Sequence, residues 1–246
     1  GWIAITKIDV VKDPDWIDLV ELDLQEFLSS RGFNAFSTHR INNLKREGIN
    51  KLRSSIESIK NEKLIYDESD YFRLHIDRVF SKTGFGTVVT GTVSNGSISQ
   101  GDEIEILPSQ TKAKIRGLQS HGVDTPYIKS GQRAALNLLN VKVSELYRGQ
   151  TLCHEGILKQ TSNLIARIIM VRSTNWKIKN NQRLRFHFGT TDALGRIQFR
   201  NQNTLSEDDS LNVLINFESP VVIALDDKFI IRSYSPMDTI AGGLVL

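Results

Sequence analysis

The apolar positions of residues 1–62 predict two strands and two helices in alternation. Trp2–Ile5 and Ala35–Ser37 are short apolar runs that are typical of strands. Asp13-Pro14 is a typical helix start and Arg31-Gly32 a typical helix end. Apolar residues recur at helical spacing at Trp16, Val20, Leu24, Phe27 and Leu28 in the first helix, and at Ile49, Leu52, Ile56 and Ile59 in the second. The order βαβα indicates the end of a parallel α/β domain that is too small to stand alone.

After residue 70 the period of the pattern changes from about 3.6 to about 2. Phe72, Leu74 and Ile76 alternate with polar residues, as in a half-buried strand. Short strands continue to about residue 156, and a second series begins at Asn163. The second series comprises Leu164–Val171, Leu184–Phe188, Ile197–Phe199, Leu211–Phe217, Val221–Leu225 and Phe229–Ser233. We therefore predict a mainly β chain with domains at 1–62, 63–156 and 157–246, the last two being β modules.

The segment Phe80–Val93 places three glycines, Gly84, Gly86 and Gly91, within a β-branched run. Glycines inside strand patterns mark tight turns and close backbone approach, so the segment favours a small closed barrel. Together with the following Gly101–Leu107, it resembles the second domain of translational GTPases.

Composition places the chain among ordinary globular proteins and divides its charge unevenly. The 246 residues are 39% hydrophobic and 24% charged, with a formal net charge of +3. Residues 1–70 have a net charge of −3 and the remainder +6, which suits either a polyanionic partner for the β modules or an ordinary solvated surface. A lone Cys153 excludes an internal disulfide and fits a cytoplasmic protein. No apolar run approaches the ~20 residues of a membrane span, and the start without Met or leader predicts a piece of a longer protein.

The tetrapeptide Thr6-Lys7-Ile8-Asp9 directly follows the first predicted strand and resembles the guanine-recognition motif of GTPases. A carboxylate such as that of Asp9 can accept both hydrogen bonds from the N1–H and N2–H₂ groups of guanine, which adenine lacks. Ser37-Thr38 is expected to follow the second strand and to supply the other base-contacting loop. An ordinary polar turn is the alternative for these residues. The chain contains no phosphate-binding loop or switch motif, so we expect it not to hydrolyse GTP by itself.

Longer segments resemble the selenocysteine-specific translation elongation factors, the SelB family. They are Ile76–Phe80, Arg116–Gly122, Gly131–Leu138, Arg183–Thr190, Leu194–Arg196 and Phe229–Leu246. The resemblance is loose over 10–60 and close over 70–246. It implies the C-terminal part of an α/β P-loop GTPase domain followed by two elongation-factor-type β-barrels.

The same resemblance implies that Asp77, Arg78 and Arg133 surround the selenocysteyl group of a charged tRNA. A selenol ionises far below the thiol pKa of about 8.5, so paired guanidiniums favour a selenolate over a serine hydroxyl or a cysteine thiol. Asp77 then receives the α-amino group or orients Arg78. The alternative is a surface Arg78 paired with Asp77. Arg78 shares the phase of the apolar residues Phe72, Leu74, Ile76 and Phe80, which indicates a functional pocket unless a bulge resets the phase.

The resemblance further implies GTP or GDP with Mg²⁺ as cofactor of the intact protein, selenocysteyl-tRNA and the ribosome as partners, and an mRNA hairpin read by a region beyond this chain. Arg183, Arg185, Arg196, Arg200 and Arg232 are candidates for contacts with tRNA phosphates. No catalytic residue or metal site is predicted, and His75 and His121 are expected to be solvated. Two alternatives are another tRNA-carrying GTPase, resembling elongation factor Tu or an initiation factor, and a non-translational GTPase subunit with the same barrels.

Overall fold

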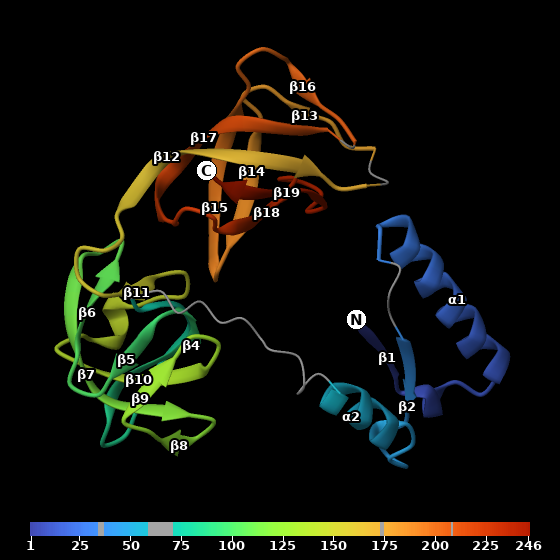
Figure 1. The fold of residues 1–246 in the computed structure, drawn as a ribbon, viewed down its shortest axis with the longest axis horizontal. Coiled ribbons are helices and arrows are strands. Elements are labelled where there is room, and N and C mark those ends of the chain that lie inside the picture. Colours follow the sequence, from blue (N-terminus) through green and yellow to red (C-terminus); the bar gives the residue numbers. More distant parts are fainter. Residues whose placement is uncertain (34–36, 59–70, 173–174, 208) are drawn as a thin grey trace. The chain divides into compact units, whose positions relative to one another are not determined.

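The computed structural model describes residues 1–33, 37–58, 71–172, 175–207 and 209–246. It divides into two compact units, Gly1–Ile65 and Tyr66–Leu246, of which the second contains most of the strands (Figure 1). None of the helices formed by the described residues is long and apolar enough to cross a membrane.

The first unit is a small α/β segment. Its elements are β1 (Trp2–Thr6), the 3₁₀-helix η1 (Ile8–Val10), α1 (Pro14–Ser30), β2 (Ser37–Ile41) and α2 (Ile49–Glu57). Strands β1 and β2 pair in parallel, with Trp2 opposite Ser37 and Thr6 opposite Ile41. The Asp13 carboxylate accepts a hydrogen bond from the Asp15 amide at the start of α1, which confirms the predicted N-cap.

The second strand continues beyond the predicted residues, to Ile41. Of the predicted Ala35–Ser37, only Ser37 is among the described residues, and it is the first residue of β2. Ile59, expected in the second helix, also lies outside the described residues, and α2 ends at Glu57. Ile41 is the only buried hydrophobic residue among the described residues of this unit, whereas Trp2, Trp16 and Phe27 are exposed.

The first barrel is closed by six strands in the order β10-β4-β3-β11-β6-β7, with β7 pairing back to β10. These strands are β3 (Arg73–Lys82), β4 (Gly86–Asn95), β6 (Glu103–Leu107), β7 (Thr111–Ser120), β10 (Arg133–Leu139) and β11 (Thr151–Cys153). Smaller elements are β5 (Ser97–Ser99), β8 (Val123–Asp124), β9 (Tyr127–Lys129) and the 3₁₀-helix η3 (Val143–Glu145). Phe72, Leu74 and Ile76 are buried in its core, as their alternation predicted.

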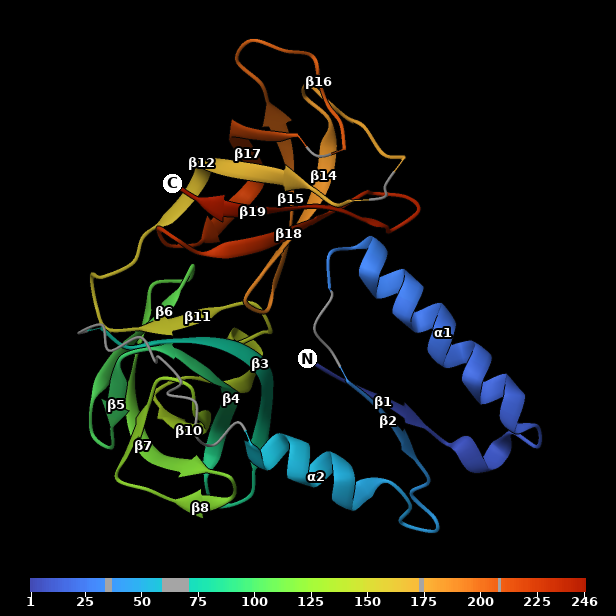
Figure 2. The same ribbon diagram turned by 45° about the vertical axis from the view of Figure 1, so that its right-hand side comes forward.

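Strands β3 and β4 run side by side in the barrel wall (Figure 2). Gly91 on β4 lies where the two backbones come close, since a Cβ atom there would be 2.3 Å from the His75 carbonyl oxygen. Gly84 lies in the β3–β4 connection, and Gly86 is the first residue of β4. The glycines therefore serve the barrel wall and its turn, as expected from their positions in the β-branched run.

The second barrel is closed in the order β12-β17-β15-β14-β18-β19. Its strands are β12 (Gln160–Met170), β14 (Arg183–Phe188), β15 (Thr191–Gln198), β17 (Ser210–Val222), β18 (Lys228–Arg232) and β19 (Thr239–Val245), with the small pair β13 (Ile178–Lys179) and β16 (Thr204–Leu205) outside the ring. The two predicted strands Leu211–Phe217 and Val221–Leu225 are one strand, β17, which continues through Pro220. The pairing of β17 with β12 is irregular just before Val221, and such an irregularity accommodates a proline.

Candidate functional site

A cavity of about 470 Å³ opens on the first barrel and is completed by the tip of one hairpin of the second. The hairpin joins β14 to β15 through the two-residue turn Gly189-Thr190. Most of the polar lining comes from β3, β4 and β10. The lining residues are His75, Asp77, Arg78, Thr92, Ser94, Arg133, Arg148, Gly189 and Thr190.

A β-bulge at Asp77 determines which side chains of β3 face this cavity. The register of β3 with β4 shifts between Ile76 and Arg78, so Asp77 has no direct partner across the strand pair. The alternation is reset there. Arg78 is exposed, Val79 packs on the core, and Phe80 is 40% exposed, so the predicted apolar phase ends at Ile76.

The Asp77 carboxylate is held by two residues from neighbouring strands. Its Oδ1 atom accepts a hydrogen bond from Thr90 Oγ1 at 2.5 Å, and its Oδ2 atom lies 2.5 Å from an Arg133 guanidinium nitrogen. Partial burial alone raises the pKa of Asp77, but the hydrogen bonds from Thr90 and Arg133 and the charges of Arg133 and Arg78 outweigh it, and the net pKa is lowered. The ion pair of Asp77 is therefore formed with Arg133 and not, as the alternative interpretation of Arg78 had required, with Arg78.

Two further guanidiniums line the cavity without such a partner. Neither Arg78 nor Arg148 forms an ion pair with any carboxylate in the described part of the chain. Arg148 lies in the turn between η3 and β11 and was not among the predicted site residues. With one carboxylate facing three guanidiniums, the cavity carries an excess of positive charge and suits an anion.

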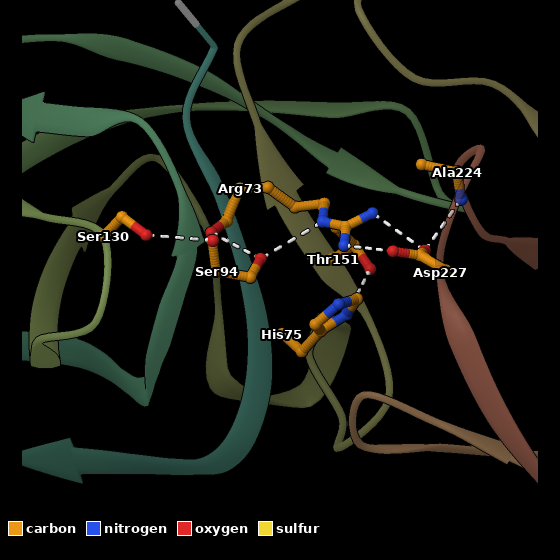
Figure 3. Close-up of polar contacts among 7 residues, drawn as sticks. All are labelled: Arg73, His75, Ser94, Ser130, Thr151, Ala224 and Asp227. Carbon is orange, nitrogen blue, oxygen red and sulfur yellow. Dashed lines mark hydrogen bonds and ion pairs between the residues drawn. The ribbon is translucent and has the colours of Figure 1, made fainter. Parts of the chain in front are cut away.

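His75 lines the wall of the cavity. The sequence analysis had expected it to be simply solvated, and it is not. Its Nδ1 atom lies 3.1 Å from Thr151 Oγ1, and it is half-buried (Figure 3). A Cβ atom on Gly189 would lie 2.6 Å from the imidazole Cγ, so only glycine at this turn allows the hairpin to pack on His75. Burial first, and the nearby Arg73 charge second, lower the pKa of His75 to about 4. The imidazole is neutral at pH 7.

This buried imidazole predicts a pH-dependent stability. Because the pKa of His75 falls from 6.5 to about 4 on folding, the unfolded chain binds the proton more tightly. The stability that the folded chain gains from a neutral His75 is complete above pH 6.5 and is lost as the pH falls towards 4. We expect His75→Asn to flatten the pH dependence of the unfolding free energy by about 2–3 kcal/mol over this interval, measured by urea unfolding. An unchanged slope in the variant would show that other groups cause the dependence.

The two barrels are joined by a buried ion pair beside the cavity (Figure 3). The Arg73 guanidinium donates to both carboxylate oxygens of Asp227, at 2.9 and 2.6 Å, and its Nε donates to Ser94 Oγ at 3.1 Å. The side chain of Arg73 is only 7% exposed. Two hydroxyls add to the contact: Thr190 donates to the Ile76 carbonyl at 2.6 Å and Thr191 to that of Gly149 at 2.9 Å. The Thr190 contact holds the hairpin tip against the bulge of β3, and the other contacts join the two barrels around it.

The predicted guanine-contacting residues are only partly brought together. Thr6 ends β1, and Lys7 and Asp9 follow it, all exposed. Ser37 and Thr38 instead begin β2 and pair with Trp2 and Ile3, at the opposite end of the strands. The placement of Ser37 and Thr38 in a loop after the strand was therefore wrong.

The loop that does follow β2 contains Asn42, whose Oδ1 atom accepts hydrogen bonds from the amides of Leu44 and Lys45, each at 3.1 Å. Because the carboxyl ends of parallel strands meet at one sheet edge, this loop is the neighbour of Thr6–Asp9.

Most of the candidate tRNA-contacting arginines are engaged within the second barrel. Arg183 pairs with Glu218 and Arg185 with Asp192, while Arg196 and Arg232 donate to backbone carbonyls and Arg200 is exposed. In the described part of the chain, no group of three His, Cys, Asp or Glu side chains is placed to hold a metal ion.

Comparison with known proteins agrees with this architecture. Residues 86–153 match the family model of elongation factor Tu domain 2, and residues 165–246 match that of the selenocysteine-specific elongation factor β-barrel domain. The two barrels are therefore similar to domains of translation elongation factors.

Individual relatives point to one group within these factors. Over all 246 residues the chain is 32% identical to a selenocysteine-specific elongation factor of Desulfomicrobium baculatum, of which it covers 39%. Its fold matches translation elongation factor SelB of Methanococcus maripaludis (TM-score 0.86, 22% identity, 99% of this chain and 57% of that one). It also matches a bacterial selenocysteine-specific elongation factor (TM-score 0.82, 22% identity, 100% of this chain and 39% of that one). The chain is a relative of the selenocysteine-specific elongation factors, as its motifs indicated, and spans well under two thirds of their length.

Proposed function

We propose that this chain is the barrel region and part of the GTPase domain of a factor that binds selenocysteyl-tRNA and delivers it to the ribosome at recoded stop codons. The observation that supports this best is the cavity in which Arg78 and Arg148 have no carboxylate partner among the residues that the structure describes, while Arg133 pairs with Asp77. The curated relative carries the same specificity in its name.

In this proposal the cavity receives the selenocysteyl side chain as an anion. A selenol is ionised at neutral pH, whereas a thiol of pKa about 8.5 is mostly protonated and a serine hydroxyl is neutral. A guanidinium about 4 Å from a unit charge contributes about 4 kcal/mol at an effective dielectric constant of about 20, and less where water has access. Arg78 and Arg133 supply this attraction, and the free lone pairs of Asp77 remain available to the α-amino group.

The first unit is proposed to hold the guanine base of GTP or GDP through Thr6, Lys7 and Asp9. The left-handed backbone of Lys7 (φ 59°) turns the chain sharply after β1 and leaves Asp9 exposed beyond the strand end. The Asn42 loop is the neighbour that we propose in place of Ser37-Thr38. Mg²⁺ and the phosphates are expected to be bound by parts of the intact protein that this chain does not include, and GTP hydrolysis belongs to that protein.

The proposed partners follow from the same function. They are the charged tRNA, whose phosphates the exposed cations of the second barrel are suited to meet, the ribosome, and an mRNA hairpin contacted by a further region, all in the cytoplasm. A factor of the elongation factor Tu or initiation type needs a cavity that tolerates neutral side chains, which the excess of guanidiniums disfavours. A non-translational GTPase subunit needs no acyl cavity.

The experiment is ester protection by the intact protein. With GTP it should slow the hydrolysis of selenocysteyl-tRNA at least tenfold, and with GDP much less. A non-translational subunit would leave the hydrolysis rate unchanged with either nucleotide, and that result would reject the proposed function.

A further inference from the structure

The bulge at Asp77 creates a positioning problem that Thr90 is placed to solve. A bulged residue has no partner in the ladder, so its side-chain direction depends on side-chain contacts. Thr90 is a residue of β4, where its partners across the strand pairs are Arg78 of β3 and Ala135 of β10. It is therefore situated between the bulged strand and the strand that carries Arg133. Its hydroxyl reaches Asp77 Oδ1 at 2.5 Å.

The three side chains differ in exposure, and Arg133 is the most exposed of them. Thr90 is partly buried, the Asp77 side chain is 19% exposed and that of Arg133 is 49% exposed. A half-exposed ion pair contributes little free energy, too little to fix a guanidinium on a long flexible stem. A hydrogen bond to a charged acceptor is stronger than one between neutral groups, and the β-branched threonine is stiff at χ1. Thr90 therefore fixes Asp77 without the help of Arg133.

We propose that Thr90 is a positioning residue of this cavity: by holding the Asp77 carboxylate, its hydroxyl fixes Arg133 at the cavity wall and thereby sets the selectivity for an anionic acyl group. Thr90 acts only through Asp77 and Arg133 and leaves Arg78 unaffected. The inference rests on the proposed function for its ligand but not for its geometry.

The first test measures the preference of the intact protein for selenocysteyl- over seryl-tRNA by ester protection. Thr90→Val, which removes the hydroxyl at constant shape, should lower the preference about five- to tenfold, the scale of the net contribution of one typical hydrogen bond. Thr90→Ser, which keeps the hydroxyl, should retain most of it. Thr111→Val, the same change on a partly exposed residue of β7 outside the cavity, should have no effect.

A double-mutant cycle separates positioning from a general loss of structure. In an Arg133→Met background, Thr90→Val should cause no further loss of preference, because its effect passes through Arg133. Additive losses, or a full preference in Thr90→Val, would overturn the inference while leaving the proposed function intact. If Thr90→Val does not fold, the comparison of Thr90→Ala with Thr90→Ser decides the same question.

A second test needs no tRNA. The pKa of Asp77, followed by ¹³C NMR of labelled carboxyl groups in the intact protein, should rise in Thr90→Val and stay near its original value in Thr90→Ser, because the Thr90 hydrogen bond lowers it. An unchanged pKa in Thr90→Val would contradict the positioning role. If the wild type shows no selenocysteine preference at all, the proposed function fails, and this titration still decides whether Thr90 holds Asp77.

Discussion

Replacing Arg73 by methionine is expected to lower the free energy of unfolding of the barrel region by about 3–5 kcal/mol. The guanidinium is bound by both oxygens of Asp227 across the two barrels and is almost completely buried. Without it, the Asp227 carboxylate loses its cation in a partly buried position, and such an unpaired charge is far more costly than a missing surface pair. Urea unfolding followed by circular dichroism measures the loss.

The control for this prediction replaces both partners. Arg73→Met combined with Asp227→Leu should recover most of the stability, because two apolar side chains of similar size can substitute for a buried ion pair. Arg183→Met, which breaks the exposed pair with Glu218, should cost at most about 1 kcal/mol. A loss below about 1 kcal/mol in Arg73→Met would mean that the buried pair does not join the barrels.

Replacing Arg78 by alanine should reduce the preference for selenocysteyl- over seryl-tRNA about 10- to 100-fold, with little change in the binding of seryl-tRNA. Arg78 has no carboxylate partner among the described residues, so its full charge acts on a bound anion, whereas Asp77 neutralises part of the charge of Arg133. The expected range corresponds to about 1.4–2.8 kcal/mol, which is below the 4 Å Coulomb value because Arg78 is exposed to water.

Ester-protection rates for both tRNAs test this, with Arg133→Ala expected to have the smaller effect. Arg167→Ala, an exposed arginine of β12 that contacts Asn212, serves as the matched control and should keep the full preference. An unchanged preference in Arg78→Ala would remove Arg78 from the account of selectivity. An equal loss of protection for both tRNAs in Arg78→Ala would assign Arg78 to general tRNA binding.

The sequence predicted the fold well wherever one local rule determined the structure. Asp13 and Pro14 marked the start of α1, and the alternation of Phe72, Leu74 and Ile76 marked the core face of β3. The prediction was wrong where pairing with distant strands determined the limits of a strand. Pro220 suggested a break within what is the single strand β17, and the polar residues Thr38, His39 and Arg40 hid the continuation of the second strand to Ile41.

Only those residues of the site that lie within recognisable motifs could be predicted from the sequence. Family resemblance brought Asp77, Arg78 and Arg133 together, and the structure places all three at one cavity. Arg148, Thr90 and the hairpin tip at Gly189 were missed, because they come from separate turns and strands that only the closed barrels bring together. The pairing of Asp77 with Arg133 likewise depends on the bulge, for which the sequence carried no signal beyond a charged pair in an apolar phase.

Ester protection of the same tRNA charged with selenocysteine, cysteine or serine, by the intact protein with GTP at pH 7, tests the central claim most directly. The cavity is proposed to select an anion, and of the three side chains only the selenol is largely ionised at this pH. The account predicts at least tenfold stronger protection of the selenocysteyl ester than of either other ester, with cysteine and serine close together. Equal protection of all three would contradict an anion-selective cavity.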